Sequence, residues 1–180
     1  MLVDSNASDA ASAFAVLLHP HPDYGGDRFH PFIDTLYNRL PDISVSAIRF
    51  DFSTAQATGA RHQVLAAIDL GAERWPDLPV IVVGYSFGSG IAAMVDDPRI
   101  AGWYLLAPPA VMLAHATIGD DPRPKAVLVP ERDQFSPPAT VEQLIGGWRS
   151  VTMSTLAGAD HFLGPVHPAV DHALSWIGST

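Results

Sequence analysis

The segment around Ser86 has the residue types and spacing that suit a nucleophilic serine. Residues 80–83 (Val-Ile-Val-Val) lead into Gly84-Tyr85-Ser86-Phe87-Gly88, and small residues follow. A buried strand, a turn too tight for flanking side chains and a helix together expose a serine hydroxyl as a nucleophile. The alternative is a glycine-rich turn whose serine only caps a helix. We interpret Ser86 as a nucleophile.

A nucleophilic serine needs a base to accept its proton and an acid to orient that base. His161 is the candidate base, because it follows the last expected strand in a short turn. Asp133 is the candidate acid, because it follows the strand before that one. Glu131 is a rival acid two residues earlier, and Asp160 adjoins the histidine but is badly placed to face it. The order serine, acid, histidine is typical of a hydrolase triad.

Two backbone N–H groups are candidates to stabilise the oxyanion that such a serine generates. One belongs to Phe87, directly after the nucleophile. The other belongs to His21, because its neighbours Pro20 and Pro22 have no N–H to donate. The alternative is that this segment is an ordinary turn before a helix.

The aromatic residues near these positions are candidate walls of a substrate site, although each could equally belong to the core. These candidates are Tyr24, Tyr85, Phe87, Phe135 and Phe162. A metal site is a weaker alternative for the cluster of His19, His21, His30, Asp23 and Asp27, because no matching ligand pair occurs elsewhere. We therefore expect no metal and no cofactor.

Apolar runs alternate with helical patterns along the chain, which predicts parallel strands joined by helices. The expected strands are residues 13–18, 43–50, 79–85, 102–107, 125–130 and 151–157. The expected helices are residues 28–40, 56–74, 87–96, 138–147 and 168–178. Within two of these strands, 43–50 and 151–157, apolar residues alternate with residues that carry a hydroxyl. We therefore place these two strands at or near the edges of the sheet. The proline-rich residues 108–124 are the least regular, and we place them over the strand tips as a possible short lid.

Length and composition indicate one globular domain over residues 1–180, with residues 1–12 expected to be flexible. The net charge of −9 and the single lysine argue against a nucleic-acid partner and against docking on anionic membranes. No apolar stretch is long enough to span a membrane, and the polar start is unlike a signal peptide. The chain has no cysteine, which fits a cytoplasmic location. A small-molecule acyl substrate and a monomer or homodimer are expected.

Five motifs occur in order along most of the chain. They are His19-Pro20-His21-Pro22-Asp23-Tyr24-Gly25-Gly26, Arg49-Phe50-Asp51-Phe52, Gly84-Tyr85-Ser86-Phe87-Gly88, Asp133, and Ala159-Asp160-His161-Phe162. In these motifs the chain resembles the α/β-hydrolase superfamily, and more narrowly a small, lidless, dienelactone-hydrolase-like group of serine hydrolases. That group typically has Gly-Phe-Ser-Phe-Gly around the serine. The resemblance implies a minimal α/β-hydrolase fold with about six mostly parallel strands flanked by helices and no cap domain.

The chain departs from that group in two places. Ser53-Thr54-Ala55-Gln56 replaces the usual Arg-Gly after the second motif, and Pro130-Glu131-Arg132 replaces a glycine before the acid. The first departure bears on substrate preference and the second on which residue is the acid. The sequence predicts a serine hydrolase acting on an ester or thioester of a small or exposed acyl substrate. The alternatives are an acyltransferase or peptidase with the same triad, and a non-catalytic ligand-binding or regulatory protein on the same fold.

Overall fold

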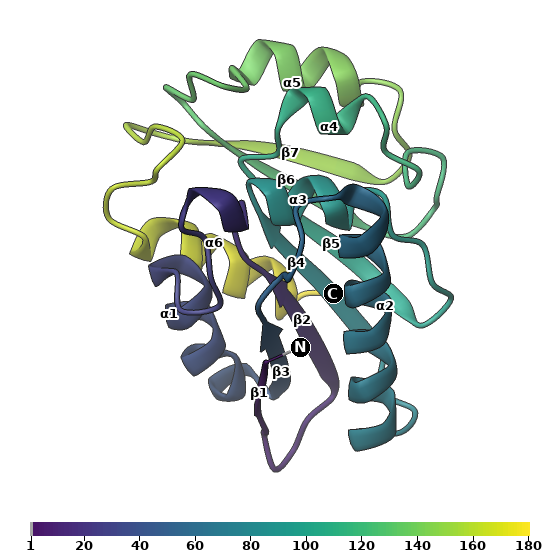
Figure 1. Cartoon of the computed structure of the whole chain (residues 1–180). Helices are drawn as coiled ribbons and strands as arrows, with labels where there is room; N and C mark the ends of the chain where they lie inside the picture. Colours follow the sequence, from purple (N-terminus) through teal and green to yellow (C-terminus); the bar gives the residue numbers. More distant parts are fainter. Residues whose placement is uncertain (1) are drawn as a thin grey trace.

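A seven-stranded sheet runs through the centre of the computed structural model, which describes residues 2–180 (Figure 1). Across the sheet the strands lie in the order β1-β3-β2-β4-β5-β6-β7. Strands β2 to β7 are parallel, and β1 pairs antiparallel with β3. The strands are β1 (Val3–Asn6), β2 (Ala13–Leu18), β3 (Val45–Phe50), β4 (Val80–Tyr85), β5 (Ile100–Leu106), β6 (Lys125–Pro130) and β7 (Val151–Leu156).

Helices cover both faces of the sheet (Figure 1). One face carries α1 (Pro31–Arg39) and α6 (His167–Ile177), which also contact each other. The other face carries α2 (Ala57–Arg74), α3 (Phe87–Ala92), the short α4 (Ala110–Leu113) and α5 (Pro138–Ile145). The 3₁₀ helices are η1 (Pro22–Tyr24) and η2 (Leu40–Ile43).

The core therefore has two layers, and the alternation of side chains along each strand assigns every residue to one of them. In β2, Phe14, Val16 and Leu18 pack with α2 and α3, whereas Ala15 and Leu17 pack with α1 and α6. Every residue of β2 is buried, as are those of β4 and β6. Of these, β4 and β6 contain the continuously apolar runs 80–83 and 126–129, a pattern typical of strands covered on both faces.

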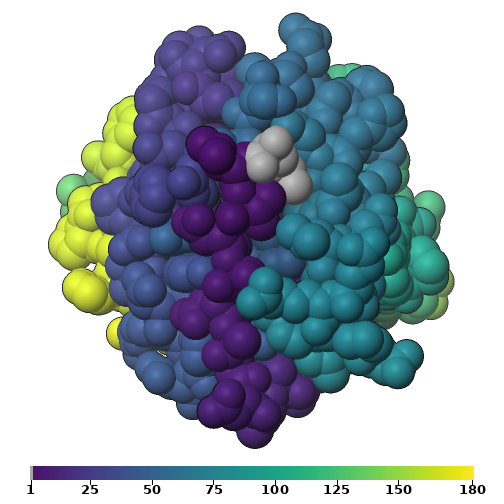
Figure 2. Space-filling model, turned by 60° about the horizontal axis from the view of Figure 1, so that its bottom comes forward, coloured from purple at the N-terminus to yellow at the C-terminus, as the bar shows by residue number. Residues whose placement is uncertain are grey.

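The expected minimal α/β architecture is confirmed: all six expected strands and all five expected helices form near the expected residues. The structure differs from the sequence analysis at Val3–Asn6, which falls within the stretch expected to be flexible. These four residues form β1, whose backbone pairs with the outer edge of β3. Asp4 on β1 also accepts hydrogen bonds from Arg28 (3.0 Å) and Arg49 (3.2 Å). Figure 2 shows this segment in purple on the surface, between residues coloured as the α1–β3 region and as α2.

Parallel pairing brings the carboxyl ends of the strands to one edge of the sheet, where ligands bind in open α/β sheets. The segments that follow β2, β4, β6 and β7 carry His21, Ser86, Asp133 and His161, respectively. Within residues 2–180, no helix combines the length and apolar character needed to cross a bilayer.

Candidate active site

Ser86 lies in the turn between β4 and α3, in a strained backbone conformation. Its φ of 52° and ψ of −117° fall in a region that residues other than glycine rarely adopt. A Cβ atom on Gly84 would lie 2.4 Å from the backbone of Ser89, and one on Gly88 would lie 2.3 Å from the carbonyl oxygen of Leu18. Both glycines are therefore required by the close approach of backbone to backbone. The turn leaves Ser86 partly exposed among buried neighbours.

His161 and Ser86 are 75 residues apart in the sequence but lie in hydrogen-bond contact. The distance from Ser86 Oγ to His161 Nε2 is 2.9 Å, and that from His161 Nδ1 to Asp133 Oδ2 is 2.7 Å. Because the Asp133 carboxylate can only accept, Nδ1 of the neutral ring carries the hydrogen and Nε2 is free to accept from the serine hydroxyl. The structure thus brings the expected nucleophile, base and acid together in one line of hydrogen bonds.

Burial and backbone contacts distinguish Asp133 from its rivals. Its carboxylate is buried, and Oδ1 accepts the N–H groups of Phe135 and Ser136, both at 2.9 Å. Glu131 is exposed and accepts the N–H of Gly158 at 2.7 Å. Asp160 accepts the N–H of Phe162 at 2.9 Å and makes no bond to the ring of His161. Of the three carboxylates, only that of Asp133 contacts the imidazole.

The loop after β2 lies against the beginning of α3, where the two expected oxyanion donors occur. A Cβ on Gly88 would also approach the carbonyl oxygen of His19 at 2.7 Å, so this loop and the serine turn are in close contact. The rings of His21 and Phe87 pack with 4.9 Å between centroids. Within residues 2–180, the N–H groups of His21 and Phe87 donate to no backbone oxygen outside their own elements. The ring contact places the residues that carry the two expected donors side by side.

Three of the five aromatic residues considered as substrate walls are exposed near the site, whereas Tyr85 and Phe87 are buried. Tyr24 is 88% exposed, Phe162 65% and Phe135 60%. The rings of Phe135 and Phe162 lie edge-on to the His161 ring, with centroid distances of 4.8 and 5.7 Å. Tyr24 packs on the ring of His21 at 4.7 Å. Phe135 and Phe162 therefore lie beside the imidazole of His161, and Tyr24 lies beside His21.

Tyr85 requires a correction, because its side chain is in the core and not at the surface of the site. It is only 2% exposed and packs against Phe32 of α1. Its hydroxyl donates to the backbone carbonyl oxygen of His161 at 2.6 Å. Burial raises the pKa of Tyr85, which keeps the hydroxyl protonated and able to donate. The sequence offered one signal of this role, namely a tyrosine where the resembled motif typically has phenylalanine.

The histidine cluster considered as a metal site is held by hydrogen bonds to the backbone. Both ring nitrogens of His19 contact backbone atoms, the carbonyl oxygen of Pro20 at 2.6 Å and the N–H of Phe52 at 2.8 Å. Nδ1 of His30 accepts the N–H of Phe32 at the start of α1. These contacts leave His19 no free lone pair for a metal. Residues 2–180 contain no group of three or more side chains suited to metal coordination.

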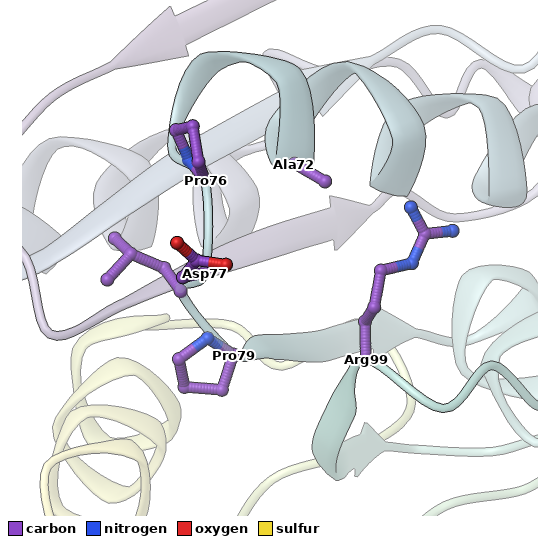
Figure 3. Close-up of a pocket in the computed structure, with 6 residues that line it drawn as sticks. Ala72, Pro76, Asp77, Pro79 and Arg99 are labelled. Atoms are coloured by element: carbon purple, nitrogen blue, oxygen red, sulfur yellow. The ribbon is translucent and has the colours of Figure 1, made fainter.

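A surface hollow of about 450 Å³ lies at the other end of β4 and is separate from this site. Figure 3 shows it between the end of α2 and Arg99, with Pro76, Asp77 and Pro79 on its lining. Pro79 directly precedes β4, whereas Ser86 directly follows it, so the length of the strand separates the two sites. The guanidinium of Arg99 is paired with Asp97 and Asp69.

Ser136 was missed by the sequence analysis, although it helps to shape the acid loop. It is fully buried, its N–H donates to Asp133, and its hydroxyl accepts the N–H of Ala110 at 2.8 Å. The second bond joins the acid loop to α4. A serine in a polar loop gives no signal of such a contact, because the partner lies 26 residues away.

Comparison with known proteins gives matches by structure alone. No protein-family model matches the chain, and no curated protein matches it by sequence. A protein of unknown function from Agrobacterium tumefaciens, described as an α/β hydrolase, superposes with a TM-score of 0.87 at 23% identity, over 97% of this chain and 88% of that one.

Two further solved structures agree with that match. An α/β serine hydrolase without a lid from Xanthomonas campestris gives a TM-score of 0.83 at 17% identity, over 96% of this chain and 85% of the other. Dienelactone hydrolase from Anabaena variabilis gives a TM-score of 0.78 at 15% identity, over 97% of this chain and 89% of the other. The motifs, the sheet order and these matches lead to one conclusion: the chain has the α/β-hydrolase fold in the form shared by lidless and dienelactone-hydrolase-like proteins.

Proposed function

We propose that this protein is a serine hydrolase that cleaves an ester or thioester of a small or exposed acyl substrate. The line of hydrogen bonds from Ser86 through His161 to Asp133 carries the proposal. A serine hydroxyl is a weak nucleophile unless a base accepts its proton, and a neutral imidazole oriented by a carboxylate supplies that base. The match to hydrolases and the strained serine turn support the same reading.

The reaction has two halves that use the same groups. Oγ of Ser86 bonds to the carbonyl carbon as its proton passes to Nε2 of His161, and the carbonyl oxygen becomes an oxyanion held by the N–H groups of Phe87 and His21. The intermediate collapses by breaking the bond to the alcohol or thiol, which takes the proton from His161. Water then attacks the acyl-serine, His161 accepts its proton, and Ser86 regains its hydroxyl as the acid product leaves.

The substrate surface consists of exposed aromatic side chains. Phe135 and Phe162 flank the imidazole, and His161 delivers its proton to the leaving group. The alcohol or thiol portion of the substrate therefore lies against these two rings. Tyr24 lies beside His21, on the oxyanion side. Open, apolar walls of this kind suit a small or protruding acyl compound.

Intact-mass labelling with a fluorophosphonate tests this proposal, using the wild type, Ser86→Ala and the control Ser179→Ala, an exposed serine near the C-terminus. We expect one adduct on the wild type and on the control, peptide mapping of that adduct to Ser86, and no adduct on Ser86→Ala. Hydrolysis of 4-nitrophenyl acetate should follow the same pattern. Wild-type activity in Ser86→Ala would refute the assignment. A folded wild type that neither labels nor hydrolyses the ester would favour a non-catalytic binding protein.

Product analysis separates the hydrolase from the other reactions that share an acyl-enzyme. The wild type is incubated with matched acetyl esters, thioesters and a short peptide, with and without an added alcohol or amine. Free acid as the main product supports hydrolysis. Transfer of the acetyl group to the added alcohol or amine would support an acyltransferase instead. Cleavage of the peptide alone would support a peptidase.

A further inference from the structure

His19 is a fully buried histidine that the proposed reaction does not use. It directly follows β2 and precedes the loop that carries the His21 N–H. Its ring makes two hydrogen bonds, both to the backbone: Nδ1 to the carbonyl oxygen of Pro20 at 2.6 Å, and Nε2 to the N–H of Phe52 at 2.8 Å. A buried polar ring held at both nitrogens is fixed in position.

These two partners determine where the hydrogen on the His19 ring lies. The carbonyl oxygen of Pro20 can only accept, and the N–H of Phe52 can only donate. Nδ1 must therefore carry the hydrogen and Nε2 must be unprotonated. Burial lowers the pKa of His19, against smaller opposing effects from the Pro20 bond and from Asp51 and Asp27. The ring is thus neutral and in a single tautomer around neutral pH.

The bond to Pro20 bears directly on the expected oxyanion donor. The carbonyl of Pro20 and the N–H of His21 belong to the same peptide group, which is trans because residues 2–180 contain no cis peptide bond. In a planar trans peptide the C=O and the N–H point in opposite directions. A hydrogen bond that fixes the Pro20 carbonyl therefore fixes the direction of the His21 N–H. It also polarises the amide, which strengthens the N–H as a donor.

The surroundings hold this peptide from other sides as well. The His19 ring packs on Phe52 with 5.0 Å between centroids, and Phe52 packs on Phe87 at 5.3 Å. A Cβ on Gly26 would lie 2.3 Å from the Pro20 carbonyl oxygen, so this glycine lets the loop fold back closely over the same peptide. One buried cluster therefore contacts the residues that carry both expected oxyanion donors, His21 and Phe87.

We propose that His19 is a positioning residue for the oxyanion hole, which orients and polarises the Pro20–His21 peptide through the hydrogen on Nδ1. This inference rests on the proposed hydrolase function. His19 does not touch the reacting atoms; it acts through the His21 N–H. Its contribution belongs to the step in which charge develops on the substrate oxygen, so it affects turnover more than substrate binding.

Two substitutions separate the two hydrogen bonds of His19. Asparagine places an amide N–H near the position of Nδ1, so His19→Asn keeps a donor for the Pro20 carbonyl and loses the acceptor for Phe52. Glutamine places an amide oxygen near the position of Nε2, so His19→Gln keeps the acceptor and loses the donor. Each variant loses one buried hydrogen bond, and a merely structural role predicts similar losses of activity and stability for both. His62→Gln, an exposed histidine on α2, is the control.

The readouts are kcat and KM for 4-nitrophenyl acetate, and inhibition by phenylboronic acid, whose tetrahedral serine adduct places an oxygen in the oxyanion hole. We expect His19→Gln to lower kcat roughly tenfold to a hundredfold relative to His19→Asn, with KM within about twofold. Boronate affinity should fall by a similar factor. Equal kcat values for the two variants would overturn the role of His19.

The two proposals can fail separately. If the wild type labels at Ser86 and depends on it, while the asparagine and glutamine variants match each other, the hydrolase function stands and the role of His19 falls. If Ser86→Ala keeps wild-type activity, the proposed function falls and the inference falls with it.

The tautomer of His19 in the wild type provides a test that needs no variant. Two-dimensional ¹⁵N–¹H spectra of ¹⁵N-histidine-labelled protein should show His19 protonated at Nδ1 only, and protonation at Nε2 would refute the proposal.

Discussion

The hydroxyl of Tyr85 donates a 2.6 Å hydrogen bond to the backbone carbonyl oxygen of His161, and this bond joins the two segments that carry the proposed nucleophile and the proposed base. Tyr85 is the last residue of β4 and directly precedes Ser86. His161 lies in the loop after β7, at the far edge of the sheet from β1. Because the bond is buried, it restrains the His161 loop at the point where the imidazole must meet the serine hydroxyl.

Tyr85→Phe removes this hydrogen bond and leaves the ring in place. We expect a loss of about 1–2 kcal/mol in the free energy of unfolding, because the carbonyl oxygen of His161 loses a buried partner. We also expect kcat to fall roughly tenfold, because small displacements of a catalytic group are costly. Urea unfolding and steady-state kinetics with 4-nitrophenyl acetate measure both. Wild-type values in both experiments would show that the bond does not position His161.

Asp133→Asn should nearly abolish activity. An amide in place of the carboxylate presents an N–H to His161 Nδ1 and favours the tautomer in which Nε2 carries the hydrogen and cannot accept from Ser86. We expect kcat/KM for 4-nitrophenyl acetate to fall about a thousandfold or more. Glu131→Gln is the matched control, because Glu131 is exposed. The amide oxygen of the substituted glutamine can still accept the N–H of Gly158. If Glu131→Gln is the variant that loses activity, Glu131 is the acid.

His21→Pro tests the oxyanion role of a single backbone N–H. The φ of His21 is −57°, which is close to the angle that proline requires, so the substitution removes the N–H and leaves the φ of residue 21 unchanged. His21→Ala removes the same side chain and keeps the N–H. We expect kcat of His21→Pro to be roughly a hundredfold below that of His21→Ala. Similar kcat values for the two variants would assign the second donor to another residue.

Stability should decrease as the pH falls from 7 to 5. Burial lowers the pKa values of His19, His30 and His172 in the folded protein, whereas in the unfolded chain they stay near 6.5. Below pH 6.5 the unfolded state therefore binds protons that the folded state does not, and the free energy of unfolding falls. The loss begins as the pH falls through 6.5, where the histidines of the unfolded chain start to bind protons.

Urea titrations at several pH values measure this loss. His19→Asn should show a smaller decrease than the wild type, because one titrating group is removed. His62→Gln should show the wild-type decrease, since His62 is exposed on α2. A wild-type stability that is constant or rises as the pH falls from 7 to 5 would contradict the effect of burial on these histidines.

Phe135→Ala and Phe162→Ala should change the preference for the alcohol portion of the ester. Both rings flank His161, which protonates the leaving group in the proposed reaction. With acetate held constant, we expect the ratio of kcat/KM for benzyl over methyl ester to fall roughly threefold to tenfold in each variant, because an apolar contact is lost. Val111→Ala, an exposed apolar residue on α4, is the control. An unchanged ratio in both variants would remove these rings from the leaving-group site.

The sequence by itself determined the elements that local patterns control. Continuously apolar runs such as residues 80–83 are typical of strands covered on both faces, and the strained turn at Ser86 is specified by the two glycines that its close backbone contacts demand. The order of the segments also placed Ser86, Asp133 and His161 at one edge of a parallel sheet. The sequence therefore identified the residues that the structure brings together.

Only the tertiary structure decided the features that depend on partners distant in the chain. The polar Val3–Asn6 becomes a strand because β3 offers it an unpaired edge. Tyr85 turns inward because α1 covers it and the carbonyl of His161 accepts its hydroxyl. The contact of Asp133 rather than Glu131 with the imidazole, and the two backbone bonds of His19, depend on side-chain directions that spacing along the chain does not fix.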